Sequence, residues 1–345
     1  MSTTKTATEA TRTDQTLQPM LEIRDLETQF FTRKGVARVL DKLSFDIRKG
    51  EIVGLVGESG SGKSVTGFSI VNLLKPPGKI VSGEILFDGR DLTKHTEDQM
   101  REIRGKSIAM IFQNPRGSLN PVLSVGEQIC QVLKHRQGMN KTQATERAIE
   151  LLKLVHIPEP ERRLKAYPHQ LSGGMAQRVM IAMAISCGPE LLIADEPTTG
   201  LDVTIEYQII QLLKEMRDLT GTSVIVITHD LNMAAEVCDR IMVMYAGKVV
   251  EQAPVEEFFT RPSHPYTLGL LASRPSLHGN EEIPTIPGNV PDLIHRPSGC
   301  PFHPRCRWAT PECSTIEPEP REVDPGHTAA CHHLEEVQRD IAATY

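Results

Sequence analysis

A glycine-rich segment, Gly57-Glu-Ser-Gly-Ser-Gly-Lys63-Ser64, constrains the fold of this chain more than any other feature of its sequence. It follows an apolar run, 52–56, that is typical of a fully buried strand, and it precedes a stretch, 64–75, with helical periodicity. In such a unit the glycines let backbone N–H groups turn inward around phosphate oxygens, and the helix N-terminus adds positive potential. We expect Lys63 to bridge the β- and γ-phosphates of a nucleotide and Ser64 to hold Mg²⁺, the alternative being a glycine-rich turn that matches by chance.

A second apolar run, Leu191-Leu-Ile-Ala194, ends in the acidic pair Asp195-Glu196. A buried strand here would deliver both carboxylates to the phosphate site at its C-terminal end. Asp195 suits the Mg²⁺ shell, directly or through water, and Glu196 is placed to polarise an attacking water, which separates hydrolysis from nucleotide binding alone. Taken alone, the pair could equally be a solvated turn; the phosphate loop upstream favours the site.

A third motif, Leu171-Ser-Gly-Gly-Met-Ala-Gln177, lies shortly before the acidic strand. Ser172, Gly173 and Gly174 precede a helical stretch and predict a further anion-binding helix N-terminus, although an ordinary helix cap has the same pattern. Because the chain then has two anion sites and one set of Mg²⁺ acids, we expect the second site to serve another subunit.

The rest of the chain predicts an α/β core followed by a smaller C-terminal piece. Alternating residues at 21–23 and 43–47 suggest half-buried antiparallel strands, 223–228 suggests a buried strand, and 141–155 and 203–219 have helical periodicity. Strands that alternate with helices around a glycine-rich loop indicate a largely parallel sheet. From Pro254 to Pro325 prolines are dense and helical periodicity is largely lost, so a domain boundary is expected near 250–265.

Composition narrows the classes of function. The chain has 345 residues, 38 Lys plus Arg against 44 Asp plus Glu, and a net charge of -6. This balance disfavours a nucleic-acid-binding protein, and the apolar runs are too short for a membrane span. Residues 1–19 lack the apolar region of an export signal and are expected to form a disordered tail in a cytosolic protein.

These motifs, in this order, resemble those of the ATP-binding-cassette (ABC) ATPases. Gln113 resembles the Q-loop glutamine, which in the family senses Mg²⁺ and the attacking water and connects to the transport subunit. Asp202 resembles the D-loop, and His229 resembles the switch histidine that contacts the γ-phosphate. The resemblance covers about 20–253 and implies a P-loop NTPase with a RecA-like parallel core, an antiparallel β-subdomain and a helical subdomain at about 116–180.

The same resemblance implies the site residues. Catalysis is expected from Glu196, His229 and Gln113, and Mg²⁺ ligation from Ser64, Gln113 and Asp195. Head-to-tail dimerisation would place ATP between Lys63 of one subunit and Ser172 and Gly174 of the other. Phe30 is the expected adenine-stacking aromatic, with Phe31 as the competitor. The complete expected ATP-binding set is Phe30, Gly57, Ser59, Gly60, Ser61, Gly62, Lys63, Ser64, Gln113, Asp195, Ser172, Gly173, Gly174, Gln177 and Asp202.

Four cysteines, Cys300, Cys306, Cys313 and Cys331, crowd the proline-rich C-terminal part of the chain. Disulfides are disfavoured in a reducing compartment. Zn²⁺ on four thiolates is chemically sound, but its usual paired C-x2–4-C spacing is missing. An iron–sulfur cluster also takes four thiolates, nearby histidines keep mixed ligation open, and four unligated cysteines are the remaining possibility.

The C-terminal segments Arg261-Pro-Ser-His-Pro-Tyr266, Ile286-Pro-Gly-Asn-Val-Pro291 and Arg296-Pro-Ser-Gly-Cys300 narrow the resemblance. They are similar to the extension, here 254–345, of dipeptide, oligopeptide and nickel importer ATPases, most of all the D-type subunits of dipeptide importers. In that subfamily the four cysteines imply a [4Fe-4S] cluster. We expect this cluster to have a structural role, in which metal ligation stabilises the folded extension.

The subfamily also implies the partners and the location of the chain. A related second ABC ATPase would form a heterodimer with it, two transmembrane permeases would bind that dimer, and an extracytoplasmic substrate-binding protein would act through the permeases. The chain would then sit peripherally on the cytoplasmic face of the inner membrane and would have no nucleic-acid partner. A nickel or other solute importer and a soluble ABC ATPase are the rival interpretations.

Overall fold

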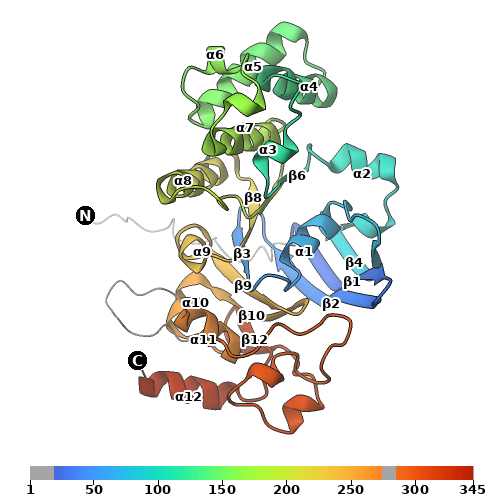
Figure 1. Ribbon diagram of the computed structural model, residues 1–345, viewed down its shortest axis with the longest axis vertical. Coiled ribbons are helices and arrows are strands. Elements are labelled where there is room, and N and C mark those ends of the chain that lie inside the picture. The colour runs from blue at the N-terminus through green and yellow to red at the C-terminus, as the bar shows by residue number, and fades with distance from the viewer. Residues whose placement is uncertain (1–18, 274–284, 345) are drawn as a thin grey trace, which may run out of the picture.

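Two β-sheets organise the residues that the computed structural model describes, 19–273 and 285–344 (Figure 1). The smaller sheet is antiparallel, has the order β2-β1-β4-β5, and consists of β1 (Leu21–Thr32), β2 (Gly35–Ile47), β4 (Gly78–Phe87) and β5 (Arg90–Asp91). The larger sheet has the order β11-β12-β10-β9-β3-β8-β7-β6. Its strands are β3 (Ile52–Val56), β6 (Ile108–Ile111), β7 (Leu191–Asp195), β8 (Ser223–Thr228), β9 (Arg240–Tyr245), β10 (Lys248–Pro254), β11 (Arg321–Asp324) and β12 (His327–Ala329).

The centre of the larger sheet is parallel. β3 pairs in parallel with both β8 and β9, β7 pairs with β8, and β6 pairs with β7. Strands β3, β7, β8 and β9 are buried along their whole length, which explains their continuous apolar sequences. The strands predicted at 52–56, 191–194 and 223–228 are confirmed. Because parallel strands end at one edge, residues that follow β3, β6, β7 and β8 are brought together there.

Strand alternation divides the apolar core between the two faces of this sheet. Val53, Leu55 and Met242 pack with the smaller sheet on one face, while Ile52, Val56 and similar neighbours pack with the helices on the other. The strands predicted at 21–23 and 43–47 are the ends of the much longer β1 and β2. The antiparallel pairing between them is confirmed.

Most of the described helices begin with a capping side chain. Ser124 and Glu127 form a capping box at one helix, and Asn140 and Gln143 form another. The predicted helices at 141–155 and 203–219 are confirmed. The helix predicted at 64–75 ends early, because Asn72 adopts a left-handed conformation with φ 48°. The helices are α1 (Lys63–Ile70), α2 (Glu97–Ile103), α3 (Pro115–Ser118), α4 (Val125–Gln137), α5 (Lys141–Leu154), α6 (Pro160–Arg163), α7 (Gly173–Ile185), α8 (Val203–Thr220), α9 (Leu231–Val237), α10 (Val255–Thr260), α11 (Pro265–Ala272) and α12 (Leu334–Thr344).

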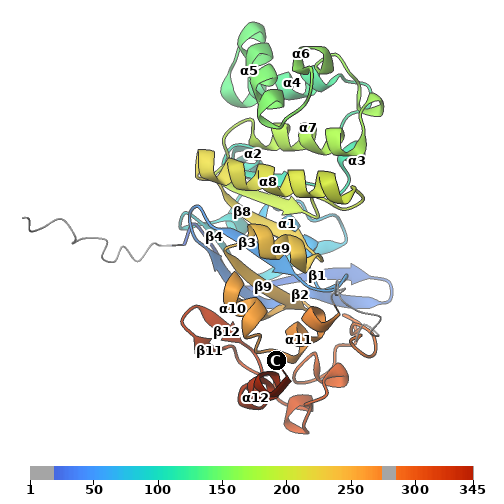
Figure 2. The same ribbon diagram turned by 90° about the vertical axis from the view of Figure 1, so that its left-hand side faces the viewer.

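Helices α3 to α7 form a group between β6 and β7 in the chain, and Figure 2 shows α4, α5 and α6 stacked beyond α7 at the end opposite the C-terminus. Within the described residues, no helix is both long enough and apolar enough to cross a membrane. The predicted tail, 1–19, lies outside the described residues except for Pro19.

The described part of the C-terminal region, 254–273 and 285–344, is built onto the larger sheet. Glu251 and Gln252 of β10 pair with Ala329 and Thr328 of β12, so the sheet continues into this region. Most of the described residues between Pro254 and Pro325 lie outside α-helices, as predicted, but two short helices that the sequence pattern did not indicate, α10 and α11, lie at the start of this stretch. Pro265 stands at the first turn of α11, where a proline starts a helix instead of breaking one.

Candidate functional site

The loop between β3 and α1 wraps around the side chain of Lys63. Lys63 Nζ donates to the carbonyl oxygens of Gly57 at 2.8 Å and Glu58 at 2.9 Å. Gly57 has φ 148°, and a Cβ there would lie 2.3 Å from the carbonyl oxygen of Met244. Only glycine fits that position, because both the backbone conformation and the close approach exclude a side chain. We refer to residues 57–64 as the phosphate loop.

Lys63, Ser64 and Asp195 meet at the carboxyl edge of the parallel strands. Ser64 Oγ donates a 2.8 Å hydrogen bond to Asp195 Oδ1, which joins the start of α1 to the end of β7. Burial raises the pKa of Asp195, and the bond from Ser64 opposes that rise. Burial also lowers the pKa of Lys63 against the attraction of Glu196 and Asp195. A divalent cation beside Asp195 would favour its ionised form, so the hydroxyl and carboxylate fit a Mg²⁺ site.

The Glu196 carboxylate is contacted by residues of two other segments and by Thr199 of its own segment. Gln113 Nε2 donates to its Oε2 at 2.7 Å, and Thr199 Oγ1 donates to the same oxygen at 2.9 Å. His229 Nδ1 lies 3.5 Å from Oε1. Glu196 itself has φ 46°, a left-handed conformation that is uncommon for this residue type and clusters at functional sites. Residues that follow β6, β7 and β8 are thus gathered around one carboxylate.

The Ser172 motif and Asp202 lie at two helix N-termini that contact each other. Ser172 caps α7 by accepting from the Met175 N–H at 3.2 Å, and Asp202 caps α8 by accepting from Ile205 N–H at 3.0 Å. A Cβ on Gly174 would lie 2.6 Å from Ile205 Cγ2, so the two helix starts pack closely. Gln177 is buried in α7. Figure 1 shows α7 in the helical group and α1 beside the smaller sheet, so the two predicted anion sites belong to different parts of the chain.

The predicted adenine-stacking aromatic, Phe30, lies in β1 opposite Gly78 of β4. A Cβ on Gly78 would approach the Phe30 ring to 2.8 Å, which shows that the ring packs over this glycine. The side chain of its neighbour Phe31 is exposed. The choice between Phe30 and Phe31 as the adenine contact stays a prediction.

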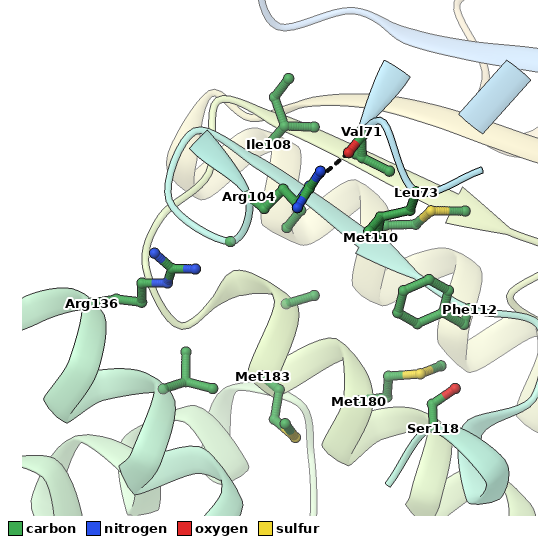
Figure 3. Close-up of a pocket in the computed structure, with 14 residues that line it drawn as sticks. Val71, Leu73, Arg104, Ile108, Met110, Phe112, Ser118, Arg136, Met180 and Met183 are labelled. Carbon is green, nitrogen blue, oxygen red and sulfur yellow. Dashed lines mark hydrogen bonds between the residues drawn. The ribbon is translucent and has the colours of Figure 1, made fainter. Parts of the chain in front are cut away.

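An apolar groove lies beside the Gln113 segment, between β6 and helices α4 and α7 (Figure 3). Phe112, the neighbour of Gln113, forms part of its wall and stacks on Phe68 with ring centroids 6.3 Å apart. Arg104 borders the groove and donates to the carbonyl oxygen of Val71 at 2.7 Å. The groove is lined by Val71, Leu73, Arg104, Gly105, Ile108, Ala109, Met110, Phe112, Ser118, Val132, Arg136, Met180, Met183 and Ala184.

Four C-terminal cysteines line one small hollow, together with His264, Phe302 and neighbouring residues. The lining cysteines are Cys300, Cys306, Cys313 and Cys331. All four are free cysteines, with no disulfide between them in the structure. In the described part of the chain, no group of three or more His, Cys, Asp or Glu side chains is arranged to hold a metal ion.

Sequence patterns did not predict two features of the site. Thr199 binds Glu196 through its hydroxyl, and Arg305 of the C-terminal region forms a bidentate ion pair with Glu58 at 2.6 and 3.0 Å. Thr199 stands three residues after Glu196, so the proximity of the two was available from the sequence. The Arg305 contact joins residues that are 247 positions apart, and no local signal indicates it.

Comparisons with known proteins agree with this geometry. Residues 40–199 match the family model described as ABC transporter, and residues 250–313 match the model described as oligopeptide/dipeptide transporter, C-terminal region. A dimeric ATP-binding cassette solved in a post-hydrolysis state with ADP and phosphate is 32% identical, with a TM-score of 0.62, and covers 68% of this chain and 99% of its own.

Curated relatives match nearly the whole chain. A probable peptide ABC transporter ATP-binding protein of Sinorhizobium fredii is 51% identical over 92% of this chain and 96% of its own length. The oligopeptide transport ATP-binding protein AppD of Bacillus subtilis is 48% identical over 93% and 98%. The dipeptide transport ATP-binding protein DppD of Escherichia coli is 46% identical over 91% and 96%. The chain therefore belongs to the ABC transporter ATP-binding proteins, in the group whose relatives serve oligopeptide and dipeptide transport.

Proposed function

We propose that this chain hydrolyses ATP to power the import of di- or oligopeptides across the cytoplasmic membrane. The observation that carries the proposal is the convergence of Lys63, the Ser64–Asp195 pair and the Gln113–Glu196–His229 group at one edge of the parallel sheet. The match of residues 250–313 to the C-terminal region of oligopeptide/dipeptide transporters supports peptides as the transported substrate.

The phosphate loop would bind the β- and γ-phosphates of ATP. Lys63 would exchange its bonds to the Gly57 and Glu58 carbonyl oxygens for phosphate oxygens, while backbone N–H groups of the loop hold the rest. Ser64 and Asp195 would hold Mg²⁺, with Gln113 close by. This ion neutralises the charge that develops on the phosphates. The loop residues Ser59, Gly60, Ser61 and Gly62 complete the proposed binding set, with Phe30 against the adenine.

Glu196 would act as the general base. Its carboxylate would accept a proton from the attacking water, since Gln113 and Thr199 hold one carboxylate oxygen and leave the other directed toward His229. His229 would contact the γ-phosphate. All of these side chains are supplied by segments that end at the same edge of the sheet, so their geometry is set by the fold.

A second ATPase subunit would complete the site. Ser172, Gly173, Gly174, Gln177 and Asp202 lie at helix starts on the helical side of the chain and would meet ATP bound to the partner's phosphate loop. Their position apart from α1 supports a head-to-tail dimer, and we propose that the partner is a related ABC ATPase, which makes a heterodimer.

We propose three functional units in the chain. Residues 20–253 would form the ATPase domain, 116–180 its helical subdomain, and 254–345 the peptide-importer extension. The apolar groove beside Phe112 would receive a segment of one of two transmembrane permeases, and the link from Phe112 to Gln113 would carry its movement to Glu196. An extracytoplasmic binding protein would deliver the peptide, and the chain would lie on the cytoplasmic face of the inner membrane, without a nucleic-acid partner.

The four C-terminal cysteines would ligate a [4Fe-4S] cluster that stabilises the fold of the extension. All four thiols line one hollow, yet they are not arranged around a single ion, as tetrahedral Zn²⁺ with sulfur atoms at about 2.3 Å would require. A cluster is larger than one ion and accepts wider spacing. The extension has a proline-rich sequence, so a ligated centre would supply part of its folding free energy.

The experiment that tests this function is purification of the tagged full-length chain from its native membranes in mild detergent, with mass identification of the co-purifying proteins. Two multi-span permeases and a second ABC ATPase support the importer. Recovery of only soluble proteins or nucleic acid, with the chain absent from membranes, would overturn it in favour of a soluble ABC ATPase. Co-purification with a nickel-binding protein instead of a peptide-binding protein would change the cargo.

A further inference from the structure

Glu58, the second residue of the phosphate loop, is held by two side chains of the C-terminal region. Arg305 donates from Nη1 to Glu58 Oε2 at 2.6 Å and from Nη2 to Oε1 at 3.0 Å. The backbone N–H of Glu58 donates to Tyr266 Oη at 2.7 Å. The side chain and the backbone of one loop residue are therefore both fixed by residues that lie beyond the ATPase core.

Arg305 is itself fixed by groups outside the loop. Its side chain is 4% exposed, its Nε donates to the carbonyl oxygen of Pro287 at 2.8 Å, and Nη1 also reaches Tyr245 Oη at 3.4 Å. The guanidinium lies 5.8 Å from the ring centre of Tyr245 and 6.0 Å from that of Phe302. A planar guanidinium held in this way presents its two N–H groups to Glu58 in one fixed direction.

Tyr266 is equally constrained. It is fully buried in α11, its ring lies 4.6 Å from Tyr245 and 5.4 Å from Phe302, and its hydroxyl is the acceptor for the Glu58 N–H. Tyr245, Tyr266 and Phe302 come from β9, α11 and the cysteine-bearing segment. The loop therefore rests on a rigid aromatic cluster that is shared between the core and the C-terminal region.

The contacts at Glu58 lead directly to the lysine that binds phosphate. Lys63 Nζ donates to the carbonyl oxygen of Glu58, the residue whose N–H and carboxylate are bound by Tyr266 and Arg305. A change in the position of Glu58 would alter both the direction of the loop N–H groups and the resting place of the Lys63 ammonium. Preorganisation of such groups sets how tightly phosphates bind.

We propose that Arg305 and Tyr266 are positioning residues of the nucleotide site, which hold Glu58 so that the phosphate loop keeps the shape that binds ATP and ADP. This inference rests on the proposed ATP binding. The C-terminal region then has a part in nucleotide affinity in addition to any contact with a partner subunit.

The test uses the purified full-length chain and measures the Kd for Mg²⁺–ATP and Mg²⁺–ADP, with kcat and KM for hydrolysis. Arg305→Met should raise both Kd values about tenfold and raise KM more than it lowers kcat, because it weakens ground-state phosphate binding. Arg305→Lys keeps the charge without the bidentate fork and should give a smaller rise. Arg296→Met is the matched control, since Arg296 is a nearly buried guanidinium of the same region that pairs with Asp41 of β2.

Two further variants keep the test decisive if Arg305→Met does not fold. Tyr266→Phe removes a single oxygen and should raise the Kd for ADP about threefold. The double variant Glu58→Gln, Arg305→Lys should have a Kd for ADP no higher than that of whichever single variant binds ADP more weakly. The reason is that both substitutions disrupt the same ion pair, between Glu58 and Arg305.

The positioning role is overturned if folded Arg305→Lys and Tyr266→Phe bind nucleotide as tightly as the wild type. It is also overturned if Arg296→Met raises the Kd as much as Arg305→Met does. Either result leaves the proposed function standing. A wild-type chain that binds neither nucleotide overturns the proposed function and this inference with it.

Discussion

The side-chain amide of Gln113 donates a hydrogen bond of 2.7 Å to the carboxylate of Glu196, across 83 positions of sequence. Gln113 follows β6 and adjoins Phe112 in the wall of the apolar groove, whereas Glu196 follows β7 at the phosphate site. One hydrogen bond therefore joins the surface proposed to receive a permease to the group proposed to activate water. A movement at the groove would reach the carboxylate without passing through the phosphate loop.

Replacing Glu196 by Gln should abolish steady-state ATP hydrolysis and leave nucleotide binding intact. The amide keeps the size of the side chain but cannot accept the proton of the attacking water, so kcat should fall by about 10²–10⁴-fold. Phosphate release and the Kd for Mg²⁺–ATP are the measurements. Retention of half of the wild-type kcat would assign the general base elsewhere.

Thr199→Val should lower kcat about five- to tenfold with little change in the Kd for ATP. The Thr199 hydroxyl donates to Glu196 Oε2 at 2.9 Å, and its loss leaves one of the bonds that orient the carboxylate unmade. Thr199→Ser keeps the hydroxyl and is the matched control, expected to retain most of the activity. Equal losses in both variants would show that the effect comes from packing.

Asp195→Asn should make the nucleotide-free chain more stable at neutral pH while it removes Mg²⁺-dependent hydrolysis. Burial raises the pKa of Asp195 above the ordinary 3.8. At pH values between the unfolded-state and folded-state pKa of Asp195, the native chain binds more protons at this carboxyl than the unfolded chain does. The free energy of unfolding therefore falls as the pH rises through this window, and the contribution of Asp195 is least favourable above it.

The amide removes this penalty, so the Tm should rise by a few degrees at neutral pH, and the difference should vanish as the pH approaches 3.8. Differential scanning calorimetry over that range, without Mg²⁺ or nucleotide, makes the measurement. A lower Tm for Asp195→Asn at neutral pH would contradict the burial argument.

Changing Cys306 or Cys331 to Ser should remove most of the iron from the anaerobically purified chain, since each supplies one of the four proposed thiolate ligands. Iron content and visible absorbance are the readouts. Cys130→Ser and Cys187→Ser are the matched controls, because both residues lie outside the hollow. If the wild-type protein contains stoichiometric zinc and no iron, the cluster proposal is wrong and the four thiolates bind Zn²⁺ instead.

Much of the core could be predicted from the sequence because its signals are local. Continuous apolar runs predicted β3, β7 and β8, since strands buried on both faces need no polar alternation. The motif residues follow those strands, so parallel pairing alone brings Lys63, Asp195 and Glu196 to one edge.

The rest depends on contacts between distant residues. β12 was not predicted because it exists by pairing with β10, and α11 was hidden among prolines, although Pro265 occupies a permitted first-turn position. The ion pair between Arg305 and Glu58 carries no local pattern at either end. Its geometry follows from the aromatic cluster that only the folded chain assembles.

The central claim is that this chain couples ATP hydrolysis to peptide import, and uptake in proteoliposomes tests it most directly. The complex purified with this chain from native membranes would be reconstituted with its binding protein, and accumulation of labelled di- and oligopeptides and of Ni²⁺ would be followed with and without internal Mg²⁺–ATP. The account predicts ATP-dependent peptide uptake that is lost in the Glu196→Gln complex. Uptake of Ni²⁺ alone, or peptide uptake that persists in Glu196→Gln, would contradict it.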